Sequence, residues 1–119
     1  MKAILVISHG SHSLETKREV SALIKKLRRE IKIPIVEYAF LEIESPSISE
    51  GIDMCIKKGA KQILITLNFL NSGKHVDQDI PRIVAAAEKK YPAVKFKITS
   101  PVGQHPRITE LFCDLIKKW

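Results

Sequence analysis

Four short apolar runs, each followed by a longer amphipathic stretch, constrain the fold of this chain more than any other feature. The runs lie near residues 2–8, 34–41, 61–68 and 94–99 and are rich in Ile, Val, Leu or Phe. Strands that alternate with helices in this way form a parallel sheet covered by helices. The sequence therefore predicts an α/β fold, with one domain over residues 1–119 and a four-stranded, mainly parallel sheet flanked by helices.

The stretches between and after these runs have the spacing of amphipathic helices. They are expected at about residues 13–31, from Ser45-Pro46 to Gly59, from between Asp77 and Pro81 to Lys90, and from Pro106 onward. Apolar residues recur in them at i, i+3 and i+4, so each helix should bury one face. In the last helix this stripe comprises Ile108, Leu111, Phe112, Leu115 and Ile116.

Right-handed crossovers restrict how such units connect, and they favour a flavodoxin-like strand order of 2-1-3-4. In that order the carboxyl ends of the first and third strands lie side by side. A sheet of four strands is narrow, and an exposed edge or half-covered face invites pairing with a second copy. A homodimer is therefore expected.

Composition narrows the class of protein. No apolar run approaches the roughly 18 residues needed to cross a bilayer, and no signal-peptide cleavage pattern follows Met1, so a cytoplasmic protein without a membrane role is expected. The two cysteines, Cys55 and Cys113, lie on apolar stripes without C-x-x-C spacing and are expected to be buried, reduced thiols.

The net charge of the chain, +7, favours an anionic partner. Only 6% of residues are aromatic and no arginine stripe is present, which disfavours nucleic acid.

Two histidines follow apolar runs. His9 comes directly after the first run and His75 follows the third. Side chains just beyond the carboxyl ends of parallel strands point into the crevice where α/β sheets bind ligands. Imidazole is a good ligand for divalent transition metals, so this pair predicts a metal site, although a single loop histidine is more often only solvated or hydrogen-bonded.

A carboxylate, Glu42, follows the second run and borders the same crevice. It would complete a site of two histidines and one carboxylate, or accept protons from a substrate. The alternative for Glu42 and the neighbouring Glu44 is simple helix-end electrostatics, which explains Glu44 well.

The segment before His75 is a polar turn. Gly73 would let the backbone turn tightly beside a ligand, and Lys74 would help to seat an anionic substrate, although it is also typical of a solvated surface. Asp77 and Asp79 are most simply helix caps, with orientation of His75 as the alternative.

Two further histidines, His12 and His105, are not assigned to the predicted metal site. His12 is expected at the entrance of the first helix, where Ser11 and Ser13 are candidate caps, although a ligand role stays open. His105 is expected to be structural or to touch a substrate.

The motifs together resemble those of the small CbiX-type sirohydrochlorin chelatases, over essentially the whole chain. The order and intervals of the following pieces carry the resemblance: His9-Gly10-Ser11, Ala39-Phe40-Leu41-Glu42, Pro46-Ser47, Phe69-Leu70, Gly73-Lys74-His75-Val76, Asp79-Ile80-Pro81 and Gly103-Gln104-His105-Pro106.

The resemblance implies a lyase that inserts a divalent metal into sirohydrochlorin without ATP or an organic cofactor, with the tetrapyrrole bound between two lobes of a homodimer. It places His9 and His75 on the metal-binding histidines and Glu42 on an acidic position for metal binding or proton removal. Gly10, Ser11, Ser72, Gly73 and Lys74 are the expected contacts to substrate carboxylates. Co2+ insertion for cobalamin is the expected reaction, with Ni2+ or Fe2+ insertion, for coenzyme F430 or sirohaem, as alternatives.

Functions of other classes are less well supported. A metal or tetrapyrrole carrier would use the same histidines without accelerating insertion. A histidine phosphatase would want dedicated phosphate-binding cations, but Ser8, not arginine, precedes His9.

Overall fold

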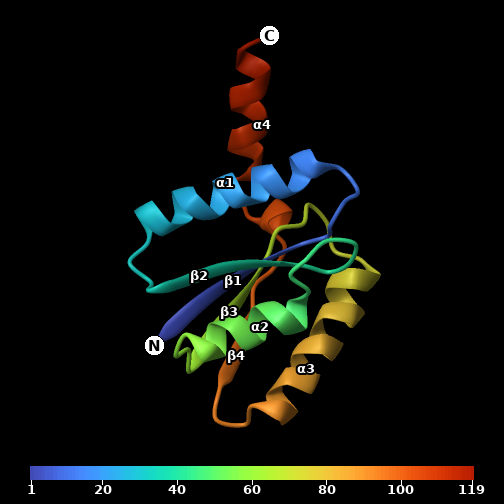
Figure 1. Cartoon of the computed structure of the whole chain (residues 1–119). Coiled ribbons are helices and arrows are strands. Elements are labelled where there is room, and N and C mark those ends of the chain that lie inside the picture. The colour runs from blue at the N-terminus through green and yellow to red at the C-terminus, as the bar shows by residue number, and fades with distance from the viewer.

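The computed structural model describes residues 1–119 and contains one parallel sheet of four strands in the order β2-β1-β3-β4. The strands are β1 (Lys2–Ser8), β2 (Ile35–Phe40), β3 (Gln62–Leu67) and β4 (Lys95–Ile98). Every neighbouring pair is parallel. The predicted α/β fold and its 2-1-3-4 strand order are therefore confirmed (Figure 1).

The helices follow the strands in alternation. They are α1 (Leu14–Glu30), α2 (Ile48–Lys57), the π-helical turn η1 (His75–Asp79), α3 (Ile80–Lys90), the 3-10 turn η2 (Val102–Gln104) and α4 (Ile108–Lys117). None of them combines the length and the apolar character needed to cross a bilayer.

Alternate residues of the strands pack on opposite faces of the sheet. On one face, Leu5 and Ile65 are fully buried in a cluster that includes Ile52 of α2 and Ile80 of α3. On the other face, α1 covers β1 and β2 in a smaller cluster (Figure 1). β1 is central, and its side chains are buried on both faces from Ala3 to Ser8, because both layers of helices cover it.

The start of α2 differs from the prediction. The helix is capped by Ser47, not Ser45, since the Ser47 side chain accepts a hydrogen bond from the Glu50 amide and the Glu50 carboxylate accepts one from the Ser47 amide. This reciprocal capping box needs an acidic or amide side chain three residues after the cap, and three residues after Ser45 the chain has Ile48. At the other end, Gly59, where the sequence predicts that the helix stops, adopts a φ of 106°, which is the left-handed conformation that glycine favours after a helix.

Helix α4 departs most from the prediction. Its apolar stripe was expected to be buried, but no residue of α4 is buried in this chain. The helix projects away from the sheet, with the C-terminus at its far end (Figure 1), and its main contact is with η2. The predicted burial is therefore correct for Cys55 and wrong for Cys113, which is exposed with the rest of α4.

Candidate metal centre

Three side chains from the segments that follow three different strands meet at the carboxyl edge of the sheet. His9, Glu42 and His75 each offer a ligand atom, and these atoms lie within 4.8 Å of one another. His9 Nε2 is 2.8 Å from Glu42 Oε1, and the two imidazole rings are 5.2 Å apart between centroids. The strand order explains the meeting, because β1 lies between β2 and β3 and the three following loops emerge side by side.

The β1–β2 ladder continues beyond the strands and places His9 beside Glu42. The Leu41 amide donates to the Ser8 carbonyl at 2.9 Å, and the Glu42 amide donates to the His9 carbonyl at 3.1 Å. Gly10 makes this approach possible: its φ is 104°, and a Cβ there would lie 1.9 Å from the Glu42 carbonyl oxygen. A side chain at position 10 is therefore excluded by both conformation and space.

Glu44 ties the same two loops together from the side. Its carboxylate accepts a hydrogen bond of 2.8 Å from the Ser11 amide. Sequence reasoning explained Glu44 by helix-end electrostatics and missed this bond, because the two residues are 33 positions apart. Its effect is to fix the loop that carries His9 against the loop that carries Glu42.

The loop after β3 is hydrogen-bonded on both sides, to β1 and to η2. Beside β1, the Asn68 amide donates to the Ile7 carbonyl, and the Asn68 side chain donates to Ser8 Oγ, each at 2.9 Å. No sequence motif had pointed to Asn68, although its polar side chain at the end of an apolar strand is the signal that was available.

On its other side, the loop after β3 rests against η2. The Gly103 amide donates to the Phe69 carbonyl, and the Gln104 side chain donates to the Leu70 carbonyl, each at 2.9 Å. A Cβ on Gly103 would lie 2.0 Å from the Leu70 carbonyl oxygen. The Gly103-Gln104 pair, which the sequence marked only as part of a motif, therefore supports the loop that leads to His75.

A carboxylate from the next turn orients His75. Its Nδ1 lies 2.8 Å from Asp79 Oδ2. His75 is the first residue of the π-helical turn η1, and Asp79 is the last. A carboxylate in this position favours the tautomer with a proton on Nδ1, so that Nε2 is the nitrogen available to a metal. The structure thus supports the alternative in which Asp79 orients His75, whereas Asp79 makes no capping hydrogen bond.

The site is open on one side. The side chains of His9, Glu42 and His75 are 46%, 50% and 47% exposed. Two imidazoles and one carboxylate leave further coordination positions for water or an incoming ligand, as in open catalytic sites. Nitrogen and oxygen donors of this kind suit Co2+, Ni2+, Fe2+ and Zn2+ alike. The arrangement is suited to a metal that is exchanged.

Three of the other predicted site residues lie in the loop that leads to His75. Ser72, Gly73 and Lys74 are exposed between β3 and η1. Gly73 has no left-handed φ, and a Cβ there would meet nothing within 4 Å, so the expectation that a tight turn requires this glycine is wrong.

The remaining two histidines lie outside the group of metal-binding candidates. His12 is in the loop before α1, where Ser13 rather than Ser11 caps the helix by accepting from the Glu15 amide. His105 Nδ1 accepts a hydrogen bond from the Arg107 amide at 3.1 Å and so has a local structural role.

The fold and the site define an α/β protein with an open cluster of two histidines and one carboxylate, able to hold a metal ion, at the edge of its sheet. The CbiX family model matches residues 3–119, and the chain belongs to the CbiX family.

Two relatives are both named as sirohydrochlorin chelatases, but their names specify different metals, iron in one and cobalt in the other. The chain is 32% identical over 114 residues to a chloroplastic sirohydrochlorin ferrochelatase of Arabidopsis thaliana, covering 96% of this chain and 51% of the relative. It is 30% identical over 118 residues to a sirohydrochlorin cobaltochelatase of Sulfolobus acidocaldarius, covering 99% and 92%.

A solved structure shares the fold closely. The sirohydrochlorin chelatase SirB of Bacillus subtilis subspecies spizizenii, in complex with cobalt, superposes with a TM-score of 0.91 at 28% identity, over 98% of this chain and 50% of that one. The chain thus spans about half the length of SirB and of the plant relative.

Proposed function

We propose that this chain is a sirohydrochlorin chelatase that inserts a divalent metal ion into the tetrapyrrole without ATP or an organic cofactor. The observation that carries the proposal is the convergence of His9, Glu42 and His75 at one open edge of the sheet. Both relatives named above are described as sirohydrochlorin chelatases.

The chemistry requires a metal that is held and then released. Insertion exchanges one divalent ion for two pyrrole protons, so the site must present a partly dehydrated ion and accept protons as the ring nitrogens bind it. His9 and His75 present the ion through their imidazoles. Glu42 is the base nearest to His9, and we assign it, or a histidine freed from the metal, the role of proton acceptor.

The tetrapyrrole is a polycarboxylate, and the chain's net charge of +7 attracts it. We place its carboxylates against exposed groups on either side of the site. The proposed contacts are Gly10 and Ser11 after β1, and Ser72, Gly73 and Lys74 before η1. The Ser11 amide already donates to Glu44, so Ser11 would act through its hydroxyl.

We propose Co2+ as the ion inserted, for cobalamin synthesis, and a cytoplasmic homodimer as the active form. A cobaltochelatase relative of nearly the same length and a cobalt-bound structural neighbour support this metal. The ferrochelatase names of other relatives support Fe2+ instead, and Ni2+ fits the same donors. Each half-exposed site would gain a second wall from another copy.

An insertion assay tests the proposal. Purified protein is added to sirohydrochlorin with Co2+, Fe2+ or Ni2+ under anaerobic conditions, and the metallated chromophore is followed by absorbance. We expect acceleration over the uncatalysed reaction, fastest with Co2+. His9→Ala and His75→Ala should each slow it by at least about 100-fold, the scale of losing a directly acting catalytic group.

Two other histidines supply matched controls. His12→Ala and His105→Ala remove the same ring outside the cluster and should leave the rate within about twofold of the starting chain. Rates equal to the uncatalysed reaction with all three ions would contradict the proposal. If the protein then still bound metal or tetrapyrrole, it would be a carrier.

A further inference from the structure

The turn that follows Glu42 places an isoleucine in a backbone conformation that this residue type rarely adopts. Ile43 has a φ of 71°, and it is the only residue other than glycine with a positive φ. The Glu44 amide donates to the Glu42 carbonyl at 2.8 Å, so these three residues form a γ-turn of the rare kind whose central residue has a positive φ. A β-branched side chain at such a φ is strained.

Hydrogen bonds on both sides of Ile43 hold the turn in this shape. The Glu42 amide donates to the His9 carbonyl, and the Glu44 carboxylate accepts from the Ser11 amide. These bonds fix the residues before and after Ile43, so Ile43 takes up the conformation that joins them. Glycine or asparagine adopts this conformation with less strain, yet the chain has isoleucine here.

The side chain of Ile43 gains little from packing within the chain. It is 51% exposed and belongs to neither hydrophobic core cluster. Burial of an aliphatic side chain would offset backbone strain, but half of this side chain remains in contact with solvent. A strained residue that the fold does not bury is a candidate for a role in binding.

Ile43 lies directly beside the candidate metal ligands. A Cβ built on Gly10 would be 3.6 Å from the Ile43 Cβ. Gly10 follows His9 and Ile43 follows Glu42, and His9 Nε2 is 2.8 Å from Glu42 Oε1. The exposed side chain of Ile43 is therefore on the rim of the ligand cluster.

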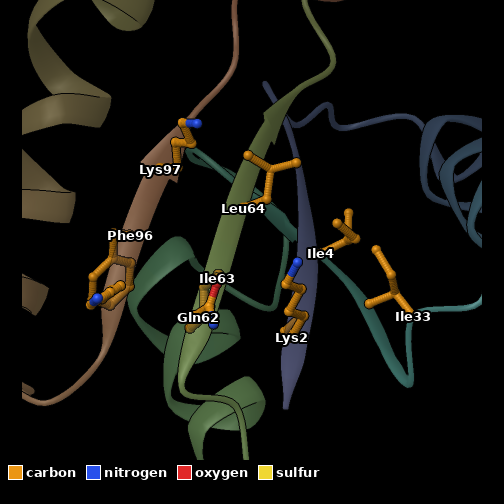
Figure 2. Close-up of a pocket in the computed structure, with 10 residues that line it drawn as sticks. Lys2, Ile4, Ile33, Gln62, Ile63, Leu64, Phe96 and Lys97 are labelled. Carbon is orange, nitrogen blue, oxygen red and sulfur yellow. The ribbon is translucent and has the colours of Figure 1, made fainter.

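Exposed apolar surface elsewhere lacks this combination of features. A hollow of about 500 Å³ lies over the sheet, with Ile4 and Leu64 among its lining residues (Figure 2). These two residues belong to the regular strands β1 and β3 and lie in their amino-terminal halves, away from the carboxyl edge. Single exposed apolar residues are common on protein surfaces. Ile43 is distinguished by its strain and by its place next to the candidate ligands.

We propose that Ile43 contacts the face of the tetrapyrrole ring while the ring nitrogens approach the metal ion. The centre of a tetrapyrrole is an apolar ring system, and its carboxylates lie at the periphery. The ring is wider than the ligand cluster, whose ligand atoms lie within 4.8 Å of one another. A ring centred over the ion therefore extends over the residues that flank the ligands.

The β-branched side chain suits this role because it has few rotamers and presents a fixed apolar surface. Such a surface sets the position of the ring over the ion, whereas the contacts proposed above hold the substrate carboxylates. The inference rests on the proposed function and adds to it a residue that positions the ring. Its tests measure binding of the metal-free tetrapyrrole, which does not require insertion.

Titration of the chain with metal-free sirohydrochlorin, followed by absorbance, tests the contact. Ile43→Asn removes the apolar side chain but tolerates the positive φ. We expect it to raise the dissociation constant about tenfold, the scale of losing the burial of part of an aliphatic side chain. Ile43→Leu keeps an apolar side chain of equal size and should stay within about threefold of the starting chain. An unchanged dissociation constant in Ile43→Asn would overturn the proposal.

Met54 supplies the matched control for the same replacement. It is 37% exposed and lies in the carboxyl-terminal half of α2 (Ile48–Lys57), which runs back from the edge that carries the site. Met54→Asn should leave the dissociation constant for sirohydrochlorin within about twofold of the starting chain. A loss equal to that of Ile43→Asn would show a general effect of lost surface hydrophobicity and would overturn the proposal.

Stability, metal affinity and mass separate a substrate contact from a structural role. Ile43→Asn relieves strain, so its Tm should be no lower than that of the starting chain. Its affinity for Co2+, measured by calorimetry, and its mass by light scattering should be unchanged. A lower Tm would show that Ile43 packs within the chain, and weaker Co2+ binding would show that it acts by placing Glu42. A change in mass would show that a second copy covers it. Each of these results would overturn the proposal.

Salt dependence identifies the contact as apolar. The ratio of dissociation constants between Ile43→Asn and the starting chain should be the same at low and high salt. The loss caused by Lys74→Ala, which removes a proposed carboxylate contact, should shrink as salt rises because salt screens exposed charges. A ratio for Ile43→Asn that shrinks in the same way would contradict an apolar contact.

Failure of this inference and failure of the proposed function give different results. If the chain accelerates metal insertion but Ile43→Asn binds sirohydrochlorin as tightly as the starting chain, the inference fails and the proposed function stands. If the chain binds sirohydrochlorin with the expected dependence on Ile43 but inserts no metal, the proposed function fails and the inference stands.

Discussion

His75 Nδ1 and Asp79 Oδ2 lie 2.8 Å apart across a single π-helical turn, so the carboxylate sets the direction in which the imidazole offers Nε2. Replacing Asp79 by Asn keeps the size but removes the charge. Loss of such an orienting carboxylate weakens metal binding by about 10- to 100-fold, and we expect Asp79→Asn to fall in this range. Calorimetric titration with Co2+ measures it.

Asp77 provides the matched control for this change. It lies in the same turn and is exposed, but it makes no hydrogen bond to His75. Asp77→Asn removes an equal charge and should change the affinity by less than about twofold. Equal losses in both variants would show that general electrostatics, rather than orientation of His75, accounts for the effect.

The glycine before Ser11 is predicted to be indispensable to the metal site. Gly10→Ala adds a Cβ where only 1.9 Å separates it from the Glu42 carbonyl oxygen, at a φ of 104°. The two loops must then part, which moves His9 away from Glu42. We expect at least about a tenfold loss of Co2+ affinity, because a displacement of about 1 Å is enough to disrupt the geometry that a site requires. The far-UV circular dichroism should be unchanged.

Gly73→Ala is the contrasting change. Position 73 lies in open space without a left-handed φ, so we expect metal affinity and thermal stability close to those of the starting chain. A similar loss of metal binding in both glycine variants would contradict this account of why Gly10 is required.

Glu44 should influence the metal site without touching the metal. Glu44→Ala removes the acceptor for the Ser11 amide, and a charge-assisted bond of this kind contributes about 1.5–3 kcal/mol when partly buried. We expect metal binding to weaken several-fold as the loops loosen. Glu19→Ala on α1, an exposed carboxylate without an ion pair, should have no effect in the same titration.

The two thiols should differ sharply in reactivity. Burial, and then the nearby Glu37 carboxylate, raises the pKa of the Cys55 thiol from 9.0 to about 12, whereas Cys113 is exposed. Since the thiolate is the reactive form, Cys113 should be alkylated by iodoacetamide at pH 8 at least about 100-fold faster than Cys55. Peptide mass spectrometry of a time course distinguishes them, and alkylation of Cys55 at a comparable rate would contradict its burial.

The same shift in pKa predicts a loss of stability in alkaline solution. A thiol whose pKa is raised on folding favours the folded state while it is neutral, and this contribution disappears as the pH rises from about 9 towards about 12. The free energy of unfolding of the starting chain should therefore fall more steeply over this range than that of Cys55→Ala, as measured by urea titration at several pH values. Parallel slopes would show that Cys55 does not titrate on unfolding.

Local pattern determined the layers of this protein. Runs of β-branched and aliphatic residues alternate with helical periodicity, which is enough to specify a parallel sheet, and right-handed crossovers leave few strand orders to choose from. His9, Glu42 and His75 could be selected because each follows an apolar run, and the carboxyl ends of parallel strands share one edge of the sheet.

Tertiary structure decided everything that depends on partners distant in sequence. The bonds from Ser11 to Glu44, from Asn68 to Ser8 and from Gly103 to Phe69 join separate loops, and no local pattern encodes them. The N-cap of α2 is Ser47 and not Ser45, because the Glu50 carboxylate accepts a hydrogen bond from the Ser47 amide and completes a capping box.

Helix α4 shows most clearly what helical periodicity in the sequence does not determine. Its periodicity correctly predicts a helix with one apolar face, because periodicity reports only that a face is to be buried. What buries the face is set by how the chain packs, and in a single chain α4 points away from the sheet and stays exposed. The sequence by itself therefore determined the elements and the candidate metal-binding side chains, whereas the tertiary structure decided how the loops fix those side chains and which surfaces stay exposed.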